Sequence, residues 1–441
     1  MEWCSWNFLV YFLIFLLPAL LFLLIRRRSK SGNHLLPPGP PGWPIFGNMF
    51  DLGTMPHRTL TELTPKFGPV IWLRLGARAT MSVQSAKAAS EFFKNHDLSF
   101  ANRTTNEKRK PSKLKEGHGV HVARFVFLMT FNLLGNLMLS RDLVDPKSNE
   151  GLEFFKAMNG LMEWNGAANM ADYFPWLRWL DPQGLKRKMK KDLGKAIQIA
   201  SKFVKERMEA RGVGREKTGD FLDLLLEFEG NGIDEPDKIS EHDLNIFILE
   251  IFMAGSETTS STTEWAMTEL LCNPETLMKA KAELTQVIGP SREIEEREID
   301  NLPYLQVPFL LPRKAMDDTD FMGYFIPKDT QVFVNAYAIG RDPDVWVDEP
   351  NSFKPERFIG SKIDYKGQYY ELIPFGAGRR MCAGVPLAHR MLHLTLGILL
   401  HQFDWSLDGN VTRDTIDWKD KLGISMRKSV PLLAVPKKCL V

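Results

Sequence analysis

The sequence predicts a mainly α-helical protein with a small β component and a single transmembrane helix at its N-terminus. Three observations support this fold class. Stretches with apolar residues at three- and four-residue spacing are longer and more numerous than alternating ones. An uncharged apolar run, Trp6 to Ile25, is long enough to cross a bilayer as a helix. The rest of the chain shows no internal repeat and no low-complexity segment, so we expect one large α-rich domain.

The composition is that of an ordinary globular protein, with 44% hydrophobic and 25% charged residues among 441. The formal net charge of +2 is too balanced to argue for a nucleic-acid partner, and none is expected. The cysteines are far apart and form no CxxC pair: Cys4, Cys272, Cys382 and Cys439. A disulfide scaffold or a structural zinc site is therefore not expected.

Residues 1–30 are interpreted as a membrane anchor with a basic flank. The basic residues at 26–30 directly follow the apolar run, and the positive-inside rule places them and the rest of the chain in the cytosol. A cleaved signal peptide is the rival interpretation, but no small-residue cleavage site is evident. Residues 31–44 are rich in proline, which fixes φ and removes donors, so they predict a stiff hinge. Residues 45–441 follow as the soluble domain.

The elements of that domain follow from local patterns. Ser240 and Asp243 resemble an N-cap pair that opens a long helix. Two short strands are expected around a turn at Gly76, and a hairpin is expected across Pro327–Thr330. The run 120–139 is a weak second membrane candidate, but its polar residues favour a buried core helix. The expected helices are 86–96, 120–139, 185–211, 221–228, 240–271 and 275–287, and the expected strands are 70–75, 79–83, 325–326, 332–334 and short segments after 403.

The most specific stretch covers residues 375–384 and contains Cys382. Gly376 and Gly378 permit positive φ, so the loop can turn tightly beside a flat ligand. Cys382 lies at the start of an apolar helix running to about Phe403, and a helix N-terminus favours a thiolate. An axial iron ligand of this type must be a thiolate. A lone cysteine is more often a small buried hydrophobe, but the neighbouring glycines and arginines make that alternative poor here.

A second stretch lies within the helix that Ser240 opens. Gly255 and the run from Ser256 to Thr263 are poor helix formers, so we expect a local opening that admits a small ligand. Glu257 and Thr258 supply a carboxylate and a hydroxyl there, which can relay protons in a general acid–base role. The alternative is a Ser/Thr-rich helix face that packs against its neighbours. Taken alone, the two interpretations weigh equally.

Residues 375–384, Phe-Gly-Ala-Gly-Arg-Arg-Met-Cys-Ala-Gly, resemble the cysteine-loop signature of the cytochrome P-450 family. The resemblance is strongest to plant microsomal members of the geraniol hydroxylase-like group. Ala254–Thr259 resembles the family's oxygen-activation motif, and Pro355–Phe358 resembles the segment that precedes its cysteine loop. The anchor and the proline hinge also resemble the family's N-terminus. The resemblance covers nearly the whole chain and implies the helix-rich, triangular cytochrome P-450 fold for residues 45–441.

The resemblance implies a haem-thiolate monooxygenase whose cofactor is iron protoporphyrin IX, with Cys382 as the axial iron ligand. One atom of dioxygen would enter an apolar small molecule and the other would leave as water. Electrons would come from an NADPH-cytochrome reductase. By family analogy the substrate is a terpenoid or a related plant specialised metabolite. The resemblance also implies a single-pass protein of the endoplasmic reticulum membrane with a cytosolic catalytic domain.

The resemblance assigns roles to further residues. Glu257 and Thr258 are the expected catalytic pair. Arg380 and Arg313 are expected to contact haem propionates. The loop residues expected to bind the cofactor are Phe375, Gly376, Gly378 and Gly384. The substrate pocket is expected to be lined by Ala254, Thr262, Phe309, Leu310 and Leu311, although an ordinary apolar strand explains 309–311 nearly as well. His389 and His393 have a metal-ligand spacing on a helix, but they lie behind the cysteine loop and are not expected to bind a metal.

Two segments expected from the family are missing. No Glu-x-x-Arg sequence lies between Leu302 and Pro308, and nothing in 102–119 matches the family's Trp-x-x-x-Arg helix. In the family, the first motif pairs with the residue that matches Arg357, a structural residue. Arg357 is therefore expected to lose both partners, which is costly for a buried arginine. This favours an alternative function: a catalytically impaired, truncated or mis-spliced member that binds haem weakly or not at all. A single-pass adaptor with an unrelated soluble domain explains none of the ordered motifs.

Overall fold

The computed structural model of the chain describes residues 35–439 except 54, 98, 100–118, 145–148, 166–168, 178, 213–218, 233–235, 290, 291, 293, 295–312, 410, 423 and 424. The chain divides into two compact units. The first comprises Met1–Thr104, Tyr173–Pro175 and Leu311–Val345, and the second comprises Thr105–Asp172, Trp176–Leu310 and Trp346–Val441. The predicted anchor, Trp6–Ile25 with its basic flank, lies outside the described residues, and the predicted domain limits stay a prediction.

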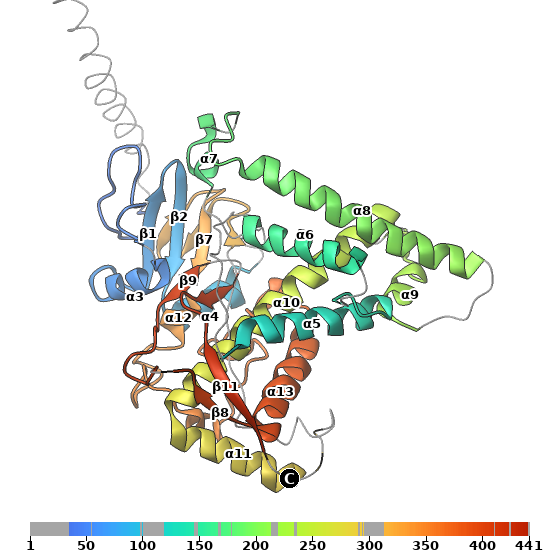
Figure 1. Ribbon diagram of the computed structural model, residues 1–441. Helices are drawn as coiled ribbons and strands as arrows, with labels where there is room; N and C mark the ends of the chain where they lie inside the picture. The colour runs from blue at the N-terminus through green and yellow to red at the C-terminus, as the bar shows by residue number, and fades with distance from the viewer. Residues whose placement is uncertain are drawn as a thin grey trace, which may run out of the picture. The chain divides into compact units, whose positions relative to one another are not determined.

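The helices and strands are named as in Figure 1, where helix labels begin at α3. The helices are α3 (Pro56–Phe67), α4 (Ala86–Asn95), α5 (Val122–Leu139), α6 (Asn149–Asn165), α7 (Met170–Tyr173), α8 (Leu185–Gly212), α9 (Phe221–Leu226), α10 (Glu241–Cys272), α11 (Pro274–Ile288), α12 (Ala336–Ile339) and α13 (Val385–Gln402). The strands are β1 (Val70–Leu75), β2 (Arg78–Val83), β3 (Val120–His121), β4 (Arg313–Lys314), β5 (Thr319–Phe321), β6 (Tyr324–Ile326), β7 (Gln331–Val334), β8 (Phe403–Leu407), β9 (Asp420–Leu422), β10 (Met426–Lys428) and β11 (Leu433–Lys438). The fold class is thus helix-rich with a small β component, as predicted, and each helix expected from the sequence is present with ends shifted by two residues or fewer.

The first unit is built on a four-stranded sheet in the order β1-β2-β7-β4 (Figure 1). β1 and β2 form the predicted antiparallel pair, and the turn between them contains Gly76 with φ of 58°. One face of β1 is buried against α3, because Ile71 and Leu73 pack with Leu60. Asn335 then fixes the end of β7: its side-chain amide donates to the carbonyl of His57 at 2.8 Å.

The hairpin predicted across Pro327–Thr330 is wrong. β6 pairs antiparallel with β5, whereas β7 pairs parallel with β2. The turn that joins β5 to β6 is Met322–Gly323, where φ is 51° and 82°. Two successive residues with positive φ give a turn whose twist matches that of a hairpin. The sequence pattern marked the strands correctly but assigned β6 the wrong partner.

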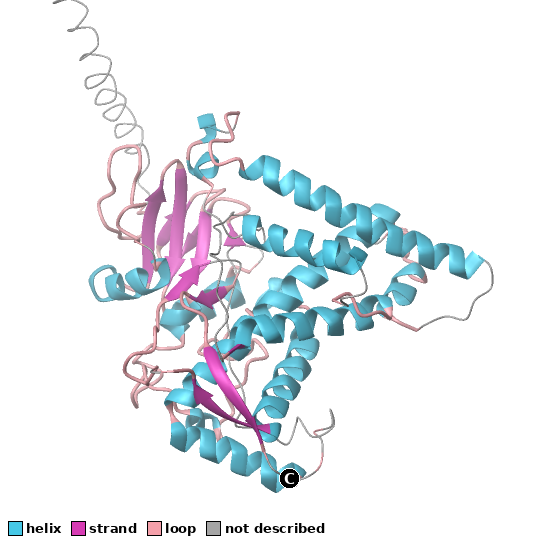
Figure 2. Cartoon of the chain, viewed as in Figure 1, coloured by secondary structure: helices cyan, strands magenta, loops and turns pink. Residues whose placement is uncertain are grey.

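The second unit is organised around α10, which packs against α5, α6, α8, α11 and α13 (Figures 1 and 2). Ser240 begins α10 as predicted, because its side chain accepts a hydrogen bond from the backbone N–H of Asp243. The core between α5, α6 and α10 is aromatic. The rings of Phe131 and Phe252 are 4.8 Å apart, and Phe154 meets Phe252 edge-on at 5.3 Å. Such pairs contribute both buried area and favourable ring geometry.

α5 is a core helix, as the sequence favoured. Its buried residues include Val126, Phe131 and Leu134, and the last two belong to the apolar cluster shared with α6, α8 and α10. Among the described residues, α5 also has the length and apolarity needed to cross a bilayer, a test that core helices of soluble proteins pass as well. Its packing against α10 assigns it to the interior of the second unit.

The local opening predicted in the central helix is wrong, since α10 is helical from Glu241 to Cys272 without interruption. Several hydroxyls of the Ser/Thr-rich run donate to carbonyls of the same helix; Ser260 donates to Glu257 at 3.0 Å and Thr263 donates to Thr259 at 2.9 Å. Gly255 instead allows α10 to pack closely against α5. A Cβ atom at this position would lie 3.0 Å from a methyl carbon of Leu134 on α5.

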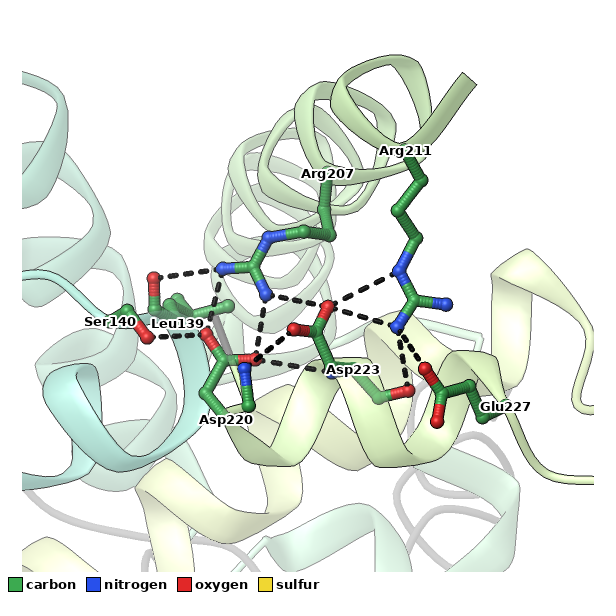
Figure 3. A network of polar contacts seen from close by, with 8 residues as sticks. Leu139, Ser140, Arg207, Arg211, Asp220, Asp223 and Glu227 are labelled. Carbon is green, nitrogen blue, oxygen red and sulfur yellow. Dashed lines mark hydrogen bonds and ion pairs between the residues drawn. The ribbon is translucent and has the colours of Figure 1, made fainter. Parts of the chain in front are cut away.

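An ion network joins α8 to α9 (Figure 3). The Arg207 guanidinium pairs with Asp220 at 2.7 Å and with Asp223 at 2.9 Å. Arg211, one turn further along α8, pairs with Asp223 at 3.1 Å and with Glu227 at 2.8 Å. The side chains of Asp220 and Asp223 are only 3% exposed, so their charges depend on the two arginines for compensation.

The C-terminal tail forms short strands, as predicted. β11 lies between β3 and β8 in one small sheet, and β9 and β10 form a second, antiparallel one. β11 also closes the core of α5, α10, α11 and α13, to which it contributes the buried Ala434. β10 lies beside α10 and brings the C-terminal tail into contact with the middle of the central helix.

Candidate functional site

The cysteine loop turns at the positions that the sequence predicted. Gly376 has φ of 77° and Gly378 has φ of 66°, both in the left-handed region that glycine adopts without strain. The backbone N–H of Cys382 donates to the carbonyl of Phe375 at 2.9 Å, which closes the loop on itself. Within it, the N–H of Met381 donates to the carbonyl of Gly378 at 3.0 Å. These bonds fix the backbone that carries the thiol.

The Cys382 side chain lies at the accessible surface of the second unit. Cys382 is exposed, whereas Cys272 is buried and Cys439 is half-buried. α13 begins three residues later, and a Cβ atom added to Gly384 would lie 3.7 Å from the Cys382 sulfur. Leu387, in the first turn of α13, packs against the core that α10 helps to form. The thiol is therefore held at the N-terminal end of a helix that is anchored in the unit's core.

The segment 365–367, which belongs to no sequence motif, supports the cysteine loop. The Tyr365 hydroxyl and the Nδ1 atom of His389 are 2.8 Å apart, and the Tyr365 ring meets that of Phe375 at 5.7 Å. Gly367 has φ of 81°, and a Cβ atom there would lie 3.0 Å from both the carbonyl oxygen of Gly376 and the sulfur of Met381. The segment 365–367 thus packs directly against the cysteine loop.

Replacing Gly367 by alanine is expected to destabilise the fold by about 1–2 kcal/mol through its left-handed backbone alone. The added methyl should also displace the cysteine loop and lower the fraction of purified chain that carries cofactor. Gly360→Ala is the matched control, because Gly360 has φ of 72° but no atom within 4 Å of an added Cβ. Thermal unfolding and cofactor content of both variants check the prediction. Equal cofactor loss in the two would show that contact with the loop is irrelevant.

Arg357 is not left unpaired, because backbone carbonyls take the place of the two family partners whose loss the sequence predicted. Its guanidinium is half-buried and donates to the carbonyls of Lys354 at 3.2 Å, Glu349 at 3.2 Å and Ser352 at 3.0 Å. It also lies 5.6 Å from the ring centroid of Trp346. The chain before Pro355 curls around Arg357, so backbone carbonyls serve as its acceptors.

The middle of α10 presents two different environments. Ala254 and Thr258 are exposed, although Ser256, Glu257 and Thr259 around them are buried. Residues four apart share a helix face, so Ala254 and Thr258 form one accessible stripe. The Thr258 hydroxyl donates to the Ala254 carbonyl within this stripe. Thr262, one turn further, is half-buried.

Glu257 is turned away from that stripe toward the C-terminal tail. Its side chain is 2% exposed, and its Oε1 atom accepts from the Ser425 hydroxyl at 2.9 Å and forms an ion pair with the Nε atom of Arg427, also at 2.9 Å. Its Oε2 atom is buried and has no hydrogen-bond partner among the described residues. The structure therefore places Glu257 and Thr258 next to each other in sequence but directs their side chains differently. Ser425 and Arg427 belong to no motif, and no local sequence signal marks them.

A second buried carboxyl lies two turns further along α10. Burial raises the pKa of Glu264 to about 7, and this outweighs the opposing effects of the Leu432 N–H and the charges of Lys428 and Arg427. The Leu432 N–H donates to its Oε1 at 2.8 Å. Because the folded pKa lies above the ordinary value of 4.5, the native state retains a proton that the unfolded chain releases.

Stability is therefore expected to fall by about 3 kcal/mol as pH rises from 4.5 to 7, when only Glu264 is considered. Glu264→Gln keeps an oxygen acceptor for Leu432 but cannot ionise. We expect this variant to match the wild type near pH 4.5 and to unfold at a higher temperature at pH 8. Glu250→Gln, at an exposed position of the same helix, is the control. A Glu264→Gln variant with no advantage at pH 8 would contradict the assignment.

The remaining predicted residues divide into two groups. Phe309, Leu310 and Leu311 lie outside the described residues. Arg313 lies in β4 of the first unit, where its backbone pairs with that of Val332. The structure does not describe its side chain. Arg380 is exposed beside Cys382 in the cysteine loop, at the end of a short 3₁₀ turn. The roles predicted for these residues stay predictions.

The residues present fit a thiolate-ligated haem. The cysteine loop supplies an accessible sulfur, two glycines in the left-handed region, and an arginine two residues before the cysteine. The stripe of Ala254 and Thr258 adds an accessible face beside the buried Ser256, Glu257 and Thr259 of α10. All of these features lie in the second unit. The donor is a single soft sulfur, which suits iron in a macrocycle that supplies its other ligands.

Comparisons with known proteins agree with this assignment. A family model described as cytochrome P450 matches residues 37–123 and 105–433. The chain is 47% identical to cytochrome P450 76A2 of Solanum melongena, over 99% of this chain and 100% of the relative. It is 47% identical to the iridoid oxidase of Catharanthus roseus, over 95% of each chain. It is also 37% identical to the geraniol 8-hydroxylase of the same species, over 94% of this chain and 96% of the relative.

The first of these alignments is longer than the chain itself. It extends over 506 positions, whereas the chain has 441 residues. At least 65 positions of the aligned relative therefore have no counterpart here.

Proposed function

The chain belongs to the cytochrome P450 family, and from this premise we propose that it hydroxylates an apolar terpenoid or a related plant specialised metabolite. Members of the family are monooxygenases that bind haem through a cysteine thiolate. The observation that carries the proposal is the intact cysteine loop with its exposed thiol at Cys382. The proposed substrate class rests on the names of the relatives, which include a geraniol hydroxylase and an iridoid oxidase.

We assign the axial ligand to Cys382. The backbone bond from its N–H to Phe375 and the left-handed turns at Gly376 and Gly378 hold the thiol in place. Gly384 leaves room for the sulfur at the start of α13. Arg380 and Arg313 are the proposed partners of the propionates. When bound, haem would supply the activation of dioxygen, which protein side chains alone do not perform.

The proposed role of α10 is to supply protons and one wall of the site. Thr258 presents a hydroxyl on the accessible stripe, where Ala254 leaves space beside it. Glu257 lies one residue away and can hold a proton at Oε2, the oxygen without a partner among the described residues. A general acid or base positioned in this way typically contributes a rate factor of about 10²–10⁴. The proposed lining of the substrate pocket is Ala254, Thr262, Phe309, Leu310 and Leu311.

The proposed partners are dioxygen, the substrate and an NADPH-cytochrome reductase as the electron donor. The proposed location is the endoplasmic reticulum membrane, with one span at Trp6–Ile25 and the catalytic domain in the cytosol. The apolar run and the basic residues that follow it support this orientation. An anchor of this kind would keep the enzyme close to apolar substrates dissolved in the bilayer.

The unmatched positions of the relative support the prediction that two family segments are missing from this chain. The alternative of an impaired member has no support from the comparisons. The argument that Arg357 would be left without partners also no longer favours it. We therefore retain the active monooxygenase as the proposed function.

The test is oxygen incorporation by the full-length chain in membranes with an NADPH-cytochrome reductase. A panel of acyclic and cyclic terpenoid alcohols is incubated under ¹⁸O₂, and products are analysed by mass spectrometry. We expect at least one product that carries a single ¹⁸O atom and depends on NADPH. Products labelled from ¹⁸O-water instead, or no product from any terpenoid when cofactor is bound, would contradict the proposal.

A further inference from the structure

A segment far from every motif, residues 425–427, reaches the buried carboxylate of Glu257. The Ser425 hydroxyl donates to Oε1 at 2.9 Å, and the Arg427 Nε atom forms an ion pair with the same oxygen at 2.9 Å. The Arg427 side chain is 42% exposed, whereas that of Glu257 is 2% exposed. The ion pair thus connects a carboxylate in the interior of the second unit to a cation that touches solvent.

The backbone of this segment is fixed by α10 itself. The carbonyl of Met426 accepts from the Ser261 hydroxyl at 2.8 Å and from the Trp265 indole N–H at 2.9 Å. Ser261 and Trp265 lie one and two turns after Glu257 on the same side of the helix. In extended chain, residues two apart lie on the same face, so Ser425 and Arg427 flank Met426 and both reach Glu257.

We infer that Arg427 is a positioning residue that holds Glu257 by Oε1 and leaves Oε2 as the oxygen that takes up and releases a proton. This inference rests on the proposed monooxygenase function. A carboxylate fixed at one oxygen loses most of its rotational freedom, so its other oxygen keeps one direction. Without Arg427, Glu257 would be a buried carboxylate with a single hydroxyl as donor, and its side chain would be free to reorient.

Other charged groups lie near the ion pair of Arg427 and Glu257. Glu264 lies two turns along α10, and both Arg427 and Lys428 act on its charge. Lys428 lies over the ring of Trp265, with its Nζ atom 4.5 Å from the centroid. A variant of Arg427 that lacks the charge would therefore change the surroundings of Glu264 as well. For this reason the test needs a second variant at Glu257, which separates the two carboxylates.

The first arm of the test measures the pair itself without relying on cofactor or activity. Thermal unfolding is recorded for the full-length wild type, Arg427→Met, Glu257→Gln and the double variant. We expect Arg427→Met to lower the midpoint by a few degrees in the wild type and by clearly less in the Glu257→Gln background. Equal shifts in both backgrounds would overturn the inference, because Arg427 would then act through another group.

The second arm measures proton delivery as product formed per NADPH consumed. Arg427→Met is expected to lower this ratio roughly tenfold, and Arg427→Lys, which restores a cation, should recover most of it. Arg413→Met, at an exposed arginine of the same tail, should leave it unchanged. An unchanged ratio in Arg427→Met, or no recovery in Arg427→Lys, would overturn the positioning role.

The two arms separate this inference from the proposed function. If the wild type binds no haem and forms no product, the proposed function fails, whereas the unfolding cycle still reports whether Arg427 and Glu257 are coupled. If the wild type is active and the cycle shows no coupling, the proposed function stands and the inference fails. Should Arg427→Met fold poorly, Arg427→Gln provides the uncharged variant for both arms.

Discussion

Replacing Cys382 by alanine is expected to abolish monooxygenase turnover, lowering it roughly 10³-fold or more, because the proposed role of Cys382 is to supply the thiolate that activates the iron. The loop itself should survive the change. Its closing bond uses the backbone N–H of residue 382, and its turns depend on Gly376 and Gly378. We therefore expect a folded chain that has lost the spectrum of a thiolate-ligated haem. Visible absorption and NADPH-dependent product formation check both parts.

Cys439→Ala is the matched control, since Cys439 is a half-buried cysteine of the same unit that lies outside the loop. Its spectrum and turnover should remain those of the wild type. Turnover by Cys382→Ala above the background without enzyme would remove Cys382 from the role of ligand.

Replacing Arg207 by methionine is expected to lower the free energy of unfolding by about 3–5 kcal/mol. The variant keeps an unbranched apolar chain but removes the guanidinium that pairs with the buried carboxylates of Asp220 and Asp223 (Figure 3). Lys195→Met, on the same helix, is the control, because the Lys195–Glu153 pair is exposed and such pairs contribute little. Denaturant unfolding of both variants checks the prediction. Equal effects in the two would contradict it.

The stabilisation that Arg207 contributes through this network is expected to depend on pH. Burial raises the pKa of Asp220, but hydrogen bonds from Arg207 and Ser140 outweigh it and hold the pKa below the ordinary value of 3.8. A lowered pKa means that this stabilisation is present above pH 3.8 and is lost as the pH falls through the folded value. The difference in stability between wild type and Arg207→Met should therefore shrink in strong acid. A difference that grows on acidification would contradict the assignment.

Local signals made much of the fold predictable. The pair of Ser240 and Asp243 located the start of α10 to within one residue, because an N-cap satisfies a backbone donor that the helix leaves free. The glycines of the cysteine loop were recognised because positive φ is costly for other residues. Helix α6 was missed, since its apolar residues are mixed with charged and small ones and give no clear helical spacing.

Contacts between distant residues were not predictable. The partner of β7 is β2, about 250 residues earlier in the chain, and no pattern within 323–334 encodes that choice. The support of the cysteine loop by Tyr365 and Gly367 depends on how the intervening chain folds back. The same holds for Arg427 and Glu257, which lie on different elements and meet only after the tail packs against α10.

Two sequence-based expectations did not allow for backbone carbonyls as acceptors. One was that the poor helix formers after Gly255 would open α10, and the other was that the loss of its family partners would leave Arg357 unpaired. Hydroxyls such as those of Ser260 and Thr263 donate to carbonyls of α10 itself, and the helix stays continuous. Arg357 likewise donates to three nearby carbonyls in place of a glutamate. Backbone carbonyls are abundant acceptors, and folded chains pair buried polar groups with them.

The central claim is that Cys382 of this chain holds a haem iron as its thiolate ligand. The most direct measurement is the visible spectrum of the purified full-length chain, first reduced and then treated with carbon monoxide. Our account predicts a Soret band with a strong red shift in the carbon monoxide complex, present in the wild type and absent from Cys382→Ala. A wild-type chain without a Soret band, or with a complex that shows no such shift, would contradict it and favour the impaired alternative.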